Sequence, residues 1–132
     1  MRRWWIVAAG LNGLAAVTAG AAAQHIWGDA TASARLAETA VRYELPHAVA
    51  LLTLGAFPTP ARKPARRLLT VAGVSLALGV TLFAAALYAL AAGASPQVTF
   101  VVPVGGSLMI LGWGLLLAFG VALGRETKAS VP

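Results

Sequence analysis

The uncharged stretch over residues 68–124 constrains the fold more than any other feature of the sequence, because it contains no Asp, Glu, Lys or Arg. A helix needs about 20 apolar residues to cross the hydrocarbon core of a bilayer. This stretch is long enough for two such helices, and Gly93-Ala94-Ser95-Pro96-Gln97 is a turn signal between them. A second uncharged stretch, residues 4–28, is long enough for one more. The sequence is therefore that of a membrane protein.

The remaining apolar block, residues 45–57, is too short to cross a bilayer by itself. A basic segment broken by prolines follows it, so its helix can extend only toward the N-terminus. We expect a span over residues 38–57, which draws ionisable side chains to the membrane surface or below it. The alternative is an interfacial helix over residues 31–43 that leads into a short buried segment.

The predicted fold is all-α, an integral membrane four-helix bundle that forms a single transmembrane domain over residues 1–132. The expected spans are residues 4–25, 38–57, 68–92 and 100–123, with a basic loop over residues 58–67. The first span also resembles a secretory signal, since Arg2-Arg3 and an apolar run precede small residues. We expect it to be retained as a span.

The basic residues predict the orientation of the chain, which has 10 Lys and Arg against 4 Asp and Glu and a formal net charge of +6. With four spans, both termini and the middle loop share one face. That face then holds eight cations: Arg2, Arg3, Arg62, Lys63, Arg66, Arg67, Arg125 and Lys128. Because positive charge gathers on the cytoplasmic side, both termini are predicted to be cytoplasmic, in a bacterial inner membrane. This explanation of the charge leaves no reason to expect a nucleic acid partner.

A series of short motifs carries a resemblance to a known family. They are Leu11-Asn12-Gly13, Gly20-Ala21 before His25, the stretch from Tyr43 to Leu51, Leu87-Tyr88, and Pro103-Val104-Gly105-Gly106 through Leu111-Gly112-Trp113. In this order they resemble the domain of unknown function 423 family, that of YgdD-like and transmembrane protein 256-like small inner-membrane proteins, over roughly residues 8–123. The resemblance implies a four-helix membrane protein. It implies no activity, because none is established for the family.

Eight polar or ionisable residues are candidates for a polar or ligand site: Asn12, His25, Glu38, Arg42, Tyr43, Glu44, His47 and Tyr88. Ionisable groups at membrane depth are costly, so they are functional candidates by default. Glu38 and Arg42 stand four residues apart, as do Tyr43 and His47, and each pair can meet on a helix. We weigh a proton or solute path against mutual neutralisation of Glu38 and Arg42 near the outer surface. Neutralisation is favoured, because no carboxylate or Lys continues a relay through the other spans.

The two histidines, His25 and His47, are candidate ligands because a neutral imidazole can bind haem iron, copper or zinc. At 1.5 Å per residue, His25 lies about 31 Å above Trp4, and His47 about 15 Å above Phe57. These different depths argue against a shared ligand. We therefore expect neither a cofactor nor a metal, and keep haem or quinone binding through either histidine as a weaker alternative.

Small residues at intervals of four predict close helix packing, since helices in lipid associate without a hydrophobic driving force. Gly73 and Ala77 stand at that interval, and the full set of positions expected to pack helices together is Gly13, Gly20, Gly73, Ala77, Gly105, Gly106 and Gly112. A cluster of cations is expected to contact lipid headgroups or the acidic face of a partner. It consists of Arg62, Lys63, Arg66 and Arg67.

No catalytic site is expected, because the sequence has no Cys and no Ser-His-Asp set, phosphate-binding loop or zinc-protease motif. The leading hypothesis is an accessory, assembly or structural subunit. Its partners would be membrane lipids and a larger membrane complex, for example a respiratory one, or copies of itself. The alternative is a small carrier or channel with a polar site on the second span.

Overall fold

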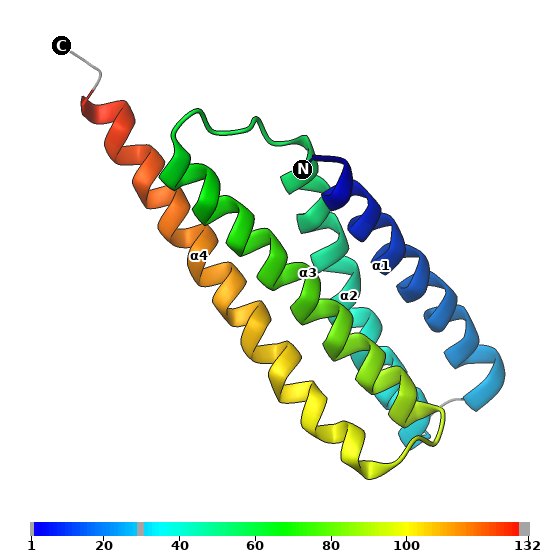
Figure 1. Ribbon diagram of the computed structural model, residues 1–132. Coiled ribbons are helices and arrows are strands. Elements are labelled where there is room, and N and C mark those ends of the chain that lie inside the picture. Colours follow the sequence, from blue (N-terminus) through cyan, green and yellow to red (C-terminus); the bar gives the residue numbers. More distant parts are fainter. Residues whose placement is uncertain (1, 29–30, 130–132) are drawn as a thin grey trace.

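Four long α-helices make up most of the described part of the chain, residues 2–28 and 31–129. In this computed structural model they are α1 (Arg2–Ala22), α2 (Ala32–Ala56), α3 (Lys63–Ala91) and α4 (Val101–Ala129). A π-helical turn, η1 (Ala23–Trp27), continues α1, and a 3-10 turn, η2 (Pro96–Phe100), leads into α4. Figure 1 shows consecutive helices running in opposite directions along one common axis. The all-helical prediction is confirmed.

The boundaries of α2 and α3 follow from capping and proline chemistry. The Thr31 hydroxyl accepts a hydrogen bond of 3.0 Å from the Ala34 amide, which caps the start of α2. From there α2 runs through Pro46 as one helix, so residues 31–43 and the apolar block after them are not separate segments. α3 begins ahead of the expected span, because Pro64 is tolerated in a first helical turn. Lys63, Arg66 and Arg67 therefore lie on a helix.

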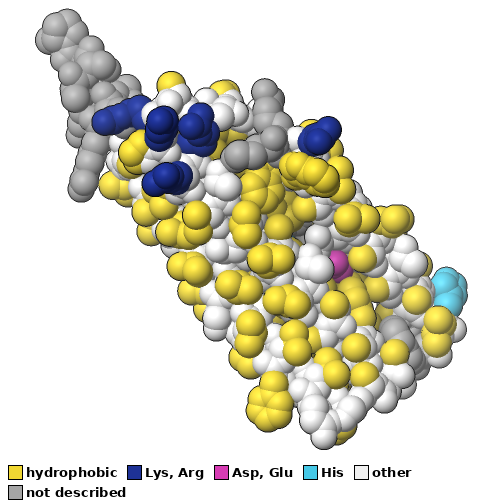
Figure 2. Space-filling view, in the orientation of Figure 1, with side chains coloured by type: hydrophobic (Ala, Val, Ile, Leu, Met, Phe, Trp, Pro, Cys, Tyr) yellow, Lys and Arg dark blue, Asp and Glu magenta, His cyan; other side chains and the backbone are white. Residues whose placement is uncertain are grey.

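Within the described residues, three helical segments are long and apolar enough to cross a membrane: Arg3–Ile26, Lys63–Ala91 and Pro96–Leu123. α2 is not among them, because its polar residues lower its hydropathy, although its 25 residues extend about 37 Å. Hydrophobic side chains cover most of the face seen in Figure 2, and Lys and Arg gather at one end. That end holds the start of α1 and the α2–α3 connection (Figure 1).

α3 is the central helix of the bundle. It packs against α2 and α4, and over a shorter stretch against α1. α1 packs mainly on α2, and α1 and α4 do not approach each other. α2 reaches α4 through side chains, as in the contact of the Phe57 and Phe119 rings, whose centroids are 5.9 Å apart. The bundle is consequently open, because α1 and α4 are not neighbours.

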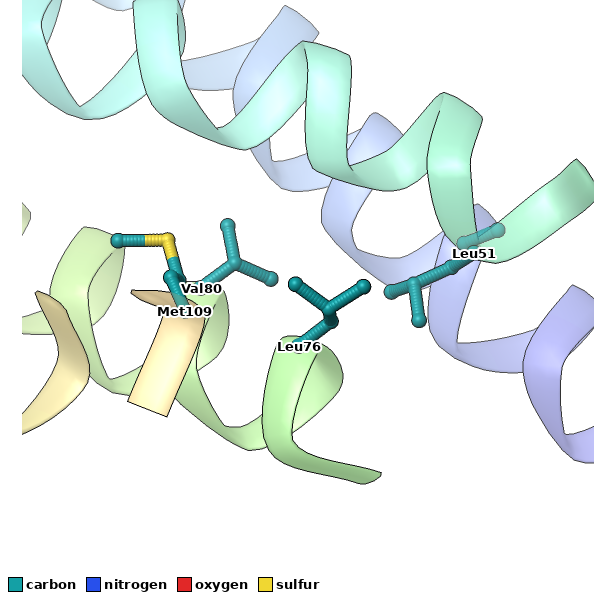
Figure 3. Packing of buried hydrophobic residues seen from close by; sticks show 5 residues of the cluster. Leu51, Leu76, Val80 and Met109 are labelled. Carbon is teal, nitrogen blue, oxygen red and sulfur yellow. The ribbon is translucent and has the colours of Figure 1, made fainter. Parts of the chain in front are cut away.

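The apolar core lies where α2, α3 and α4 meet. Leu51, Leu76 and Val80 are fully buried, and Met109 is nearly so. Figure 3 shows Leu76 between Leu51 and Val80, with Met109 beside Val80. Most other buried hydrophobic residues are alanines, which bring the helix backbones close together.

Gly79 and Gly105 set the separation of α3 and α4. A Cβ on Gly105 would lie 2.6 Å from the Phe83 backbone nitrogen, and one on Gly79 would lie 2.7 Å from the Met109 backbone nitrogen. Backbone atoms cannot move aside as a flexible side chain can. The two helices are thus in direct backbone contact, which only glycine permits at these two positions.

The other positions expected to pack differ in how closely they approach a neighbour. A Cβ on Gly112 would lie 2.6 Å from the Leu76 Cγ, and one on Gly73 would lie 2.9 Å from the Trp5 ring. The remaining positions make looser contacts or none. A Cβ on Gly13 would lie 4.0 Å from the Ala48 Cβ, and one on Gly20 would lie 3.8 Å from the Val41 Cγ2, which are ordinary van der Waals distances. Ala77 packs against the core. A Cβ on Gly106 would meet nothing within 4 Å.

We predict that Gly105→Ala destabilises the protein, because the new methyl group would force α3 and α4 apart. The expected cost is about 1–3 kcal/mol, as for other overpacked interiors. Thermal unfolding in detergent, followed by circular dichroism, measures it. Gly106→Ala is the matched control: it places the same methyl group in open space one residue away and should be neutral or stabilising. Equal melting temperatures for the two variants would contradict the packing argument.

Candidate functional site

A groove between α1 and α3 brings polar side chains from three helices together near the middle of α1 and α2. We call it the α1–α3 groove. Its volume is about 310 Å³, and it is open along one side. Its lining residues are Ala8, Leu11, Asn12 and Ala15 of α1, Glu44 of α2, and Thr81, Ala85 and Tyr88 of α3. Three of the eight candidate polar residues, Asn12, Glu44 and Tyr88, thus share one site.

Asn12 links α1 to α3. Its side chain is 5% exposed, and its Nδ2 donates to the Ala8 carbonyl oxygen at 2.9 Å. Its Oδ1 accepts a hydrogen bond of 3.2 Å from the Thr81 hydroxyl. An amide inside a membrane helix needs a partner on another helix, and Thr81 provides it.

Glu44 links α2 to α3 from the floor of the groove. It is the middle residue of α2, about 18 Å from either end, and only 3% of it is exposed. The Tyr88 hydroxyl donates to Glu44 Oε2 at 2.5 Å. A carboxyl group in an apolar interior requires such a partner. The bond therefore holds the Glu44 side chain at a fixed position beside the groove.

A second groove, rich in aromatic side chains, lies between α2 and α4 and has a volume of about 460 Å³. Tyr43, His47, Phe83 and Trp113 line it together with Gly106, Met109 and Ile110. His47 Nδ1–H donates to the Tyr43 carbonyl oxygen at 2.7 Å, and Trp113 Nε1–H donates to His47 Nε2 at 3.0 Å. Because a carbonyl only accepts and an indole N–H only donates, these partners hold a neutral imidazole with its proton on Nδ1. The Tyr43 ring packs on Phe83, with centroids 5.1 Å apart.

Glu38 and Arg42 lie at a third place. Both are exposed, and they line a groove of about 270 Å³ between the N-terminal part of α2 and the end of α1. The neutralisation of Glu38 by Arg42 stays a prediction. The polar residues of α2 consequently do not make up one site, and they face three different grooves.

His25 is not brought near His47. It lies exposed on η1, beyond the point where Gly20 of α1 contacts Val41 of α2. Along the helix axes, His25 lies about 8 Å from that contact in one direction, and His47 lies about 9 Å from it in the opposite direction. Both nitrogens of the His47 ring also have partners within the chain. Across residues 2–28 and 31–129, no three His, Cys, Asp or Glu side chains converge as a metal site requires.

The basic cluster lies at one end of the molecule. Arg62, Lys63, Arg66 and Arg67 are all exposed, and Lys63 and Arg67 line a surface groove between α3 and α4. At the same end, the Arg3 guanidinium lies 5.2 Å from the centre of the Trp4 ring. Arg125 and Lys128, which were expected on this face, lie among residues whose side chains are not described.

Thr81 and Trp113 were not predicted as site residues, nor Gly79 as a packing residue. Thr81 stands four residues after Ala77, at the interval that indicates close helix packing. Trp113 lies in one of the family motifs. For Thr81 and Trp113 the sequence thus held a signal of importance. It did not identify Asn12 and His47 as their partners, because that requires knowing at which level two helices meet.

Comparison with known proteins identifies the family. A family model described as "Protein of unknown function (DUF423)" matches residues 19–106. A Haemophilus influenzae UPF0382 membrane protein is 30% identical over 122 residues, which cover 91% of this chain and 94% of the relative. The UPF0382 inner membrane protein YgdD of Escherichia coli K12 is 28% identical over 130 residues, covering 94% of each chain.

No solved structure matches the chain. The relatives are named as membrane proteins, and YgdD as an inner membrane protein, which confirms the predicted location. Both the family match and the relatives agree with the resemblance carried by the sequence motifs. The chain belongs to the DUF423 family, whose function is unknown.

Proposed function

We propose that this protein is a non-catalytic membrane subunit that associates laterally, through the outer face of α4, with a larger membrane complex or with copies of itself. The observation that carries the proposal is the division of the glycines into two groups. Gly79, Gly105 and Gly112 are used in packing α4 against α3. Gly114 and Gly120 of α4 have nothing within 4 Å of an added Cβ.

The outer face of α4 has the shape that lateral association between membrane helices requires. Gly114 and Ala118 are exposed and stand four residues apart, a spacing of small residues that lets a second helix approach closely. Large exposed side chains flank them, including Leu111, Leu117 and Val121. Within the described residues, α4 has only α3 and the preceding η2 turn within close backbone distance, so this face is available to a partner.

Transport is less well supported than association. The polar residues that the carrier hypothesis groups together are divided among three grooves, and the principal ones are already paired. Asn12 is hydrogen-bonded to Thr81, and His47 is hydrogen-bonded to Trp113. A small carrier with a single polar path would need these groups to share one cavity.

We predict that Gly114→Leu disrupts assembly, because the larger side chain blocks close approach to the outer face of α4. The protein, expressed in its native membrane and extracted in mild detergent, should run on native gels well above its monomer size. The variant should shift most of the material to smaller species. Gly10→Leu is the matched control, since it adds the same side chain to open space on α1 and should leave the assembly intact.

Two results would overturn the assembly proposal. One is a wild-type protein that runs as a lone monomer after gentle extraction. The other is a Gly114→Leu variant whose assembly matches that of wild type. Because the chain has no Cys, a single Leu117→Cys substitution also allows clean cross-linking, which distinguishes self-association from association with another subunit.

We further propose that α2 crosses the membrane and that both termini are cytoplasmic. Its length and the basic residues at one end of the bundle support this orientation. Reporter fusions that are active only in the cytoplasm, placed at each terminus in turn, test it. Activity at both termini is expected. If α2 does not cross, three spans remain and the two fusions must report opposite sides.

A further inference from the structure

Glu44 has one carboxylate oxygen that is not used inside the protein. Tyr88 donates to Oε2, and among the residues that the structure describes none donates to Oε1. In the part of the chain that the structure describes, no fully covered side-chain nitrogen or oxygen lacks a partner. Oε1 is therefore not fully covered, and Glu44 lines the α1–α3 groove. Only 3% of Glu44 is exposed, and its unused acceptor oxygen faces this groove.

The charges around Glu44 do not neutralise it. The residues that α1 contributes to the groove carry no charge, and Tyr88 is the titratable group that faces Glu44 from α3. On α2 itself, Arg42 lines a different groove beside Glu38, and His47 is hydrogen-bonded toward α4. An isolated carboxylate is costly in an apolar environment, so either a proton or an external cation must neutralise it.

The groove favours an organic cation over a metal ion. It holds one carboxylate, too few for a divalent metal, and its volume of about 310 Å³ lies within the range of small-molecule sites. The methyl groups of Ala8, Leu11, Ala15 and Ala85 line much of it, and they suit an apolar body. The Tyr88 ring adds an aromatic surface, which attracts ammonium groups.

We propose that the α1–α3 groove binds a lipophilic monovalent ammonium ion, with its charge paired to Glu44 and its apolar part against the alanine and leucine wall. Binding exchanges one positive charge for another. The carboxylic acid form of Glu44 releases its proton to water as the ammonium ion enters, and the proton returns when the ion leaves. The site is independent of the proposed assembly face on α4, because α4 contributes nothing to this groove.

Equilibrium dialysis of labelled benzyltrimethylammonium against the purified full chain in detergent tests the site. Wild type should bind saturably at pH 8, and binding should weaken as the pH falls to 5, because protons compete for Glu44. Glu44→Gln should weaken binding by about ten- to hundredfold, as expected for the loss of a charged partner. The glutamine can still accept the Tyr88 hydrogen bond, so the fold should be retained, which a circular dichroism melt checks.

Three controls separate charge recognition from partitioning into the detergent. Glu38→Gln removes a carboxylate outside the groove and should leave the affinity unchanged. Ala85→Leu fills the groove without altering charge and should abolish binding. Neopentylbenzene, the neutral molecule of the same shape, should not bind saturably. The proposal is overturned if wild type shows no saturable binding, if Glu44→Gln or Ala85→Leu binds as wild type does, or if the neutral molecule binds equally well.

Discussion

The backbone contact between α3 and α4 at Gly79 and Gly105 is the constraint on which the rest of the structure depends. Lipid tails are as apolar as the side chains that face them, so burial alone does not hold membrane helices together. Close van der Waals contact must do so, and glycine permits the closest approach. This contact fixes α4 against the central helix. It thereby places Trp113 within reach of His47 and aligns the core around Leu76.

Side-chain hydrogen bonds add specificity to this packing. One joins α1 to α3 through Thr81, one joins α2 to α3 through Tyr88, and one joins α2 to α4 through Trp113. Bonds of this kind contribute about 0.6 kcal/mol each in membrane proteins, too little to drive assembly but enough to favour one rotation of each helix. The pairs therefore select how the helices face one another, while the small residues let them come together.

The sequence was a good guide to the helices and a poor one to the grouping of polar residues. The length of the uncharged stretches predicted α1, α3 and α4, and Gly105 and Gly112 were among the glycines expected to pack. The polar run of α2 was read as one group because its members are close in the chain. Successive helical residues differ by about 100° in direction, however, so Glu38 and His47 lie on opposite faces of α2, while Glu44 is hydrogen-bonded to α3 and His47 to α4. Thr81 and Trp113 could not be assigned as partners, because the relative depth of two helices is a property of their packing.

The hydrogen bonds of His47 make the contact between α2 and α4 dependent on the charge of a single ring. Trp113 donates to Nε2, which accepts only while the imidazole is neutral. An imidazolium has a proton on each nitrogen, so the indole N–H would face a donor and the bond would be lost. The contact between α2 and α4 at this point therefore depends on one tautomer of one side chain, the one with its proton on Nδ1.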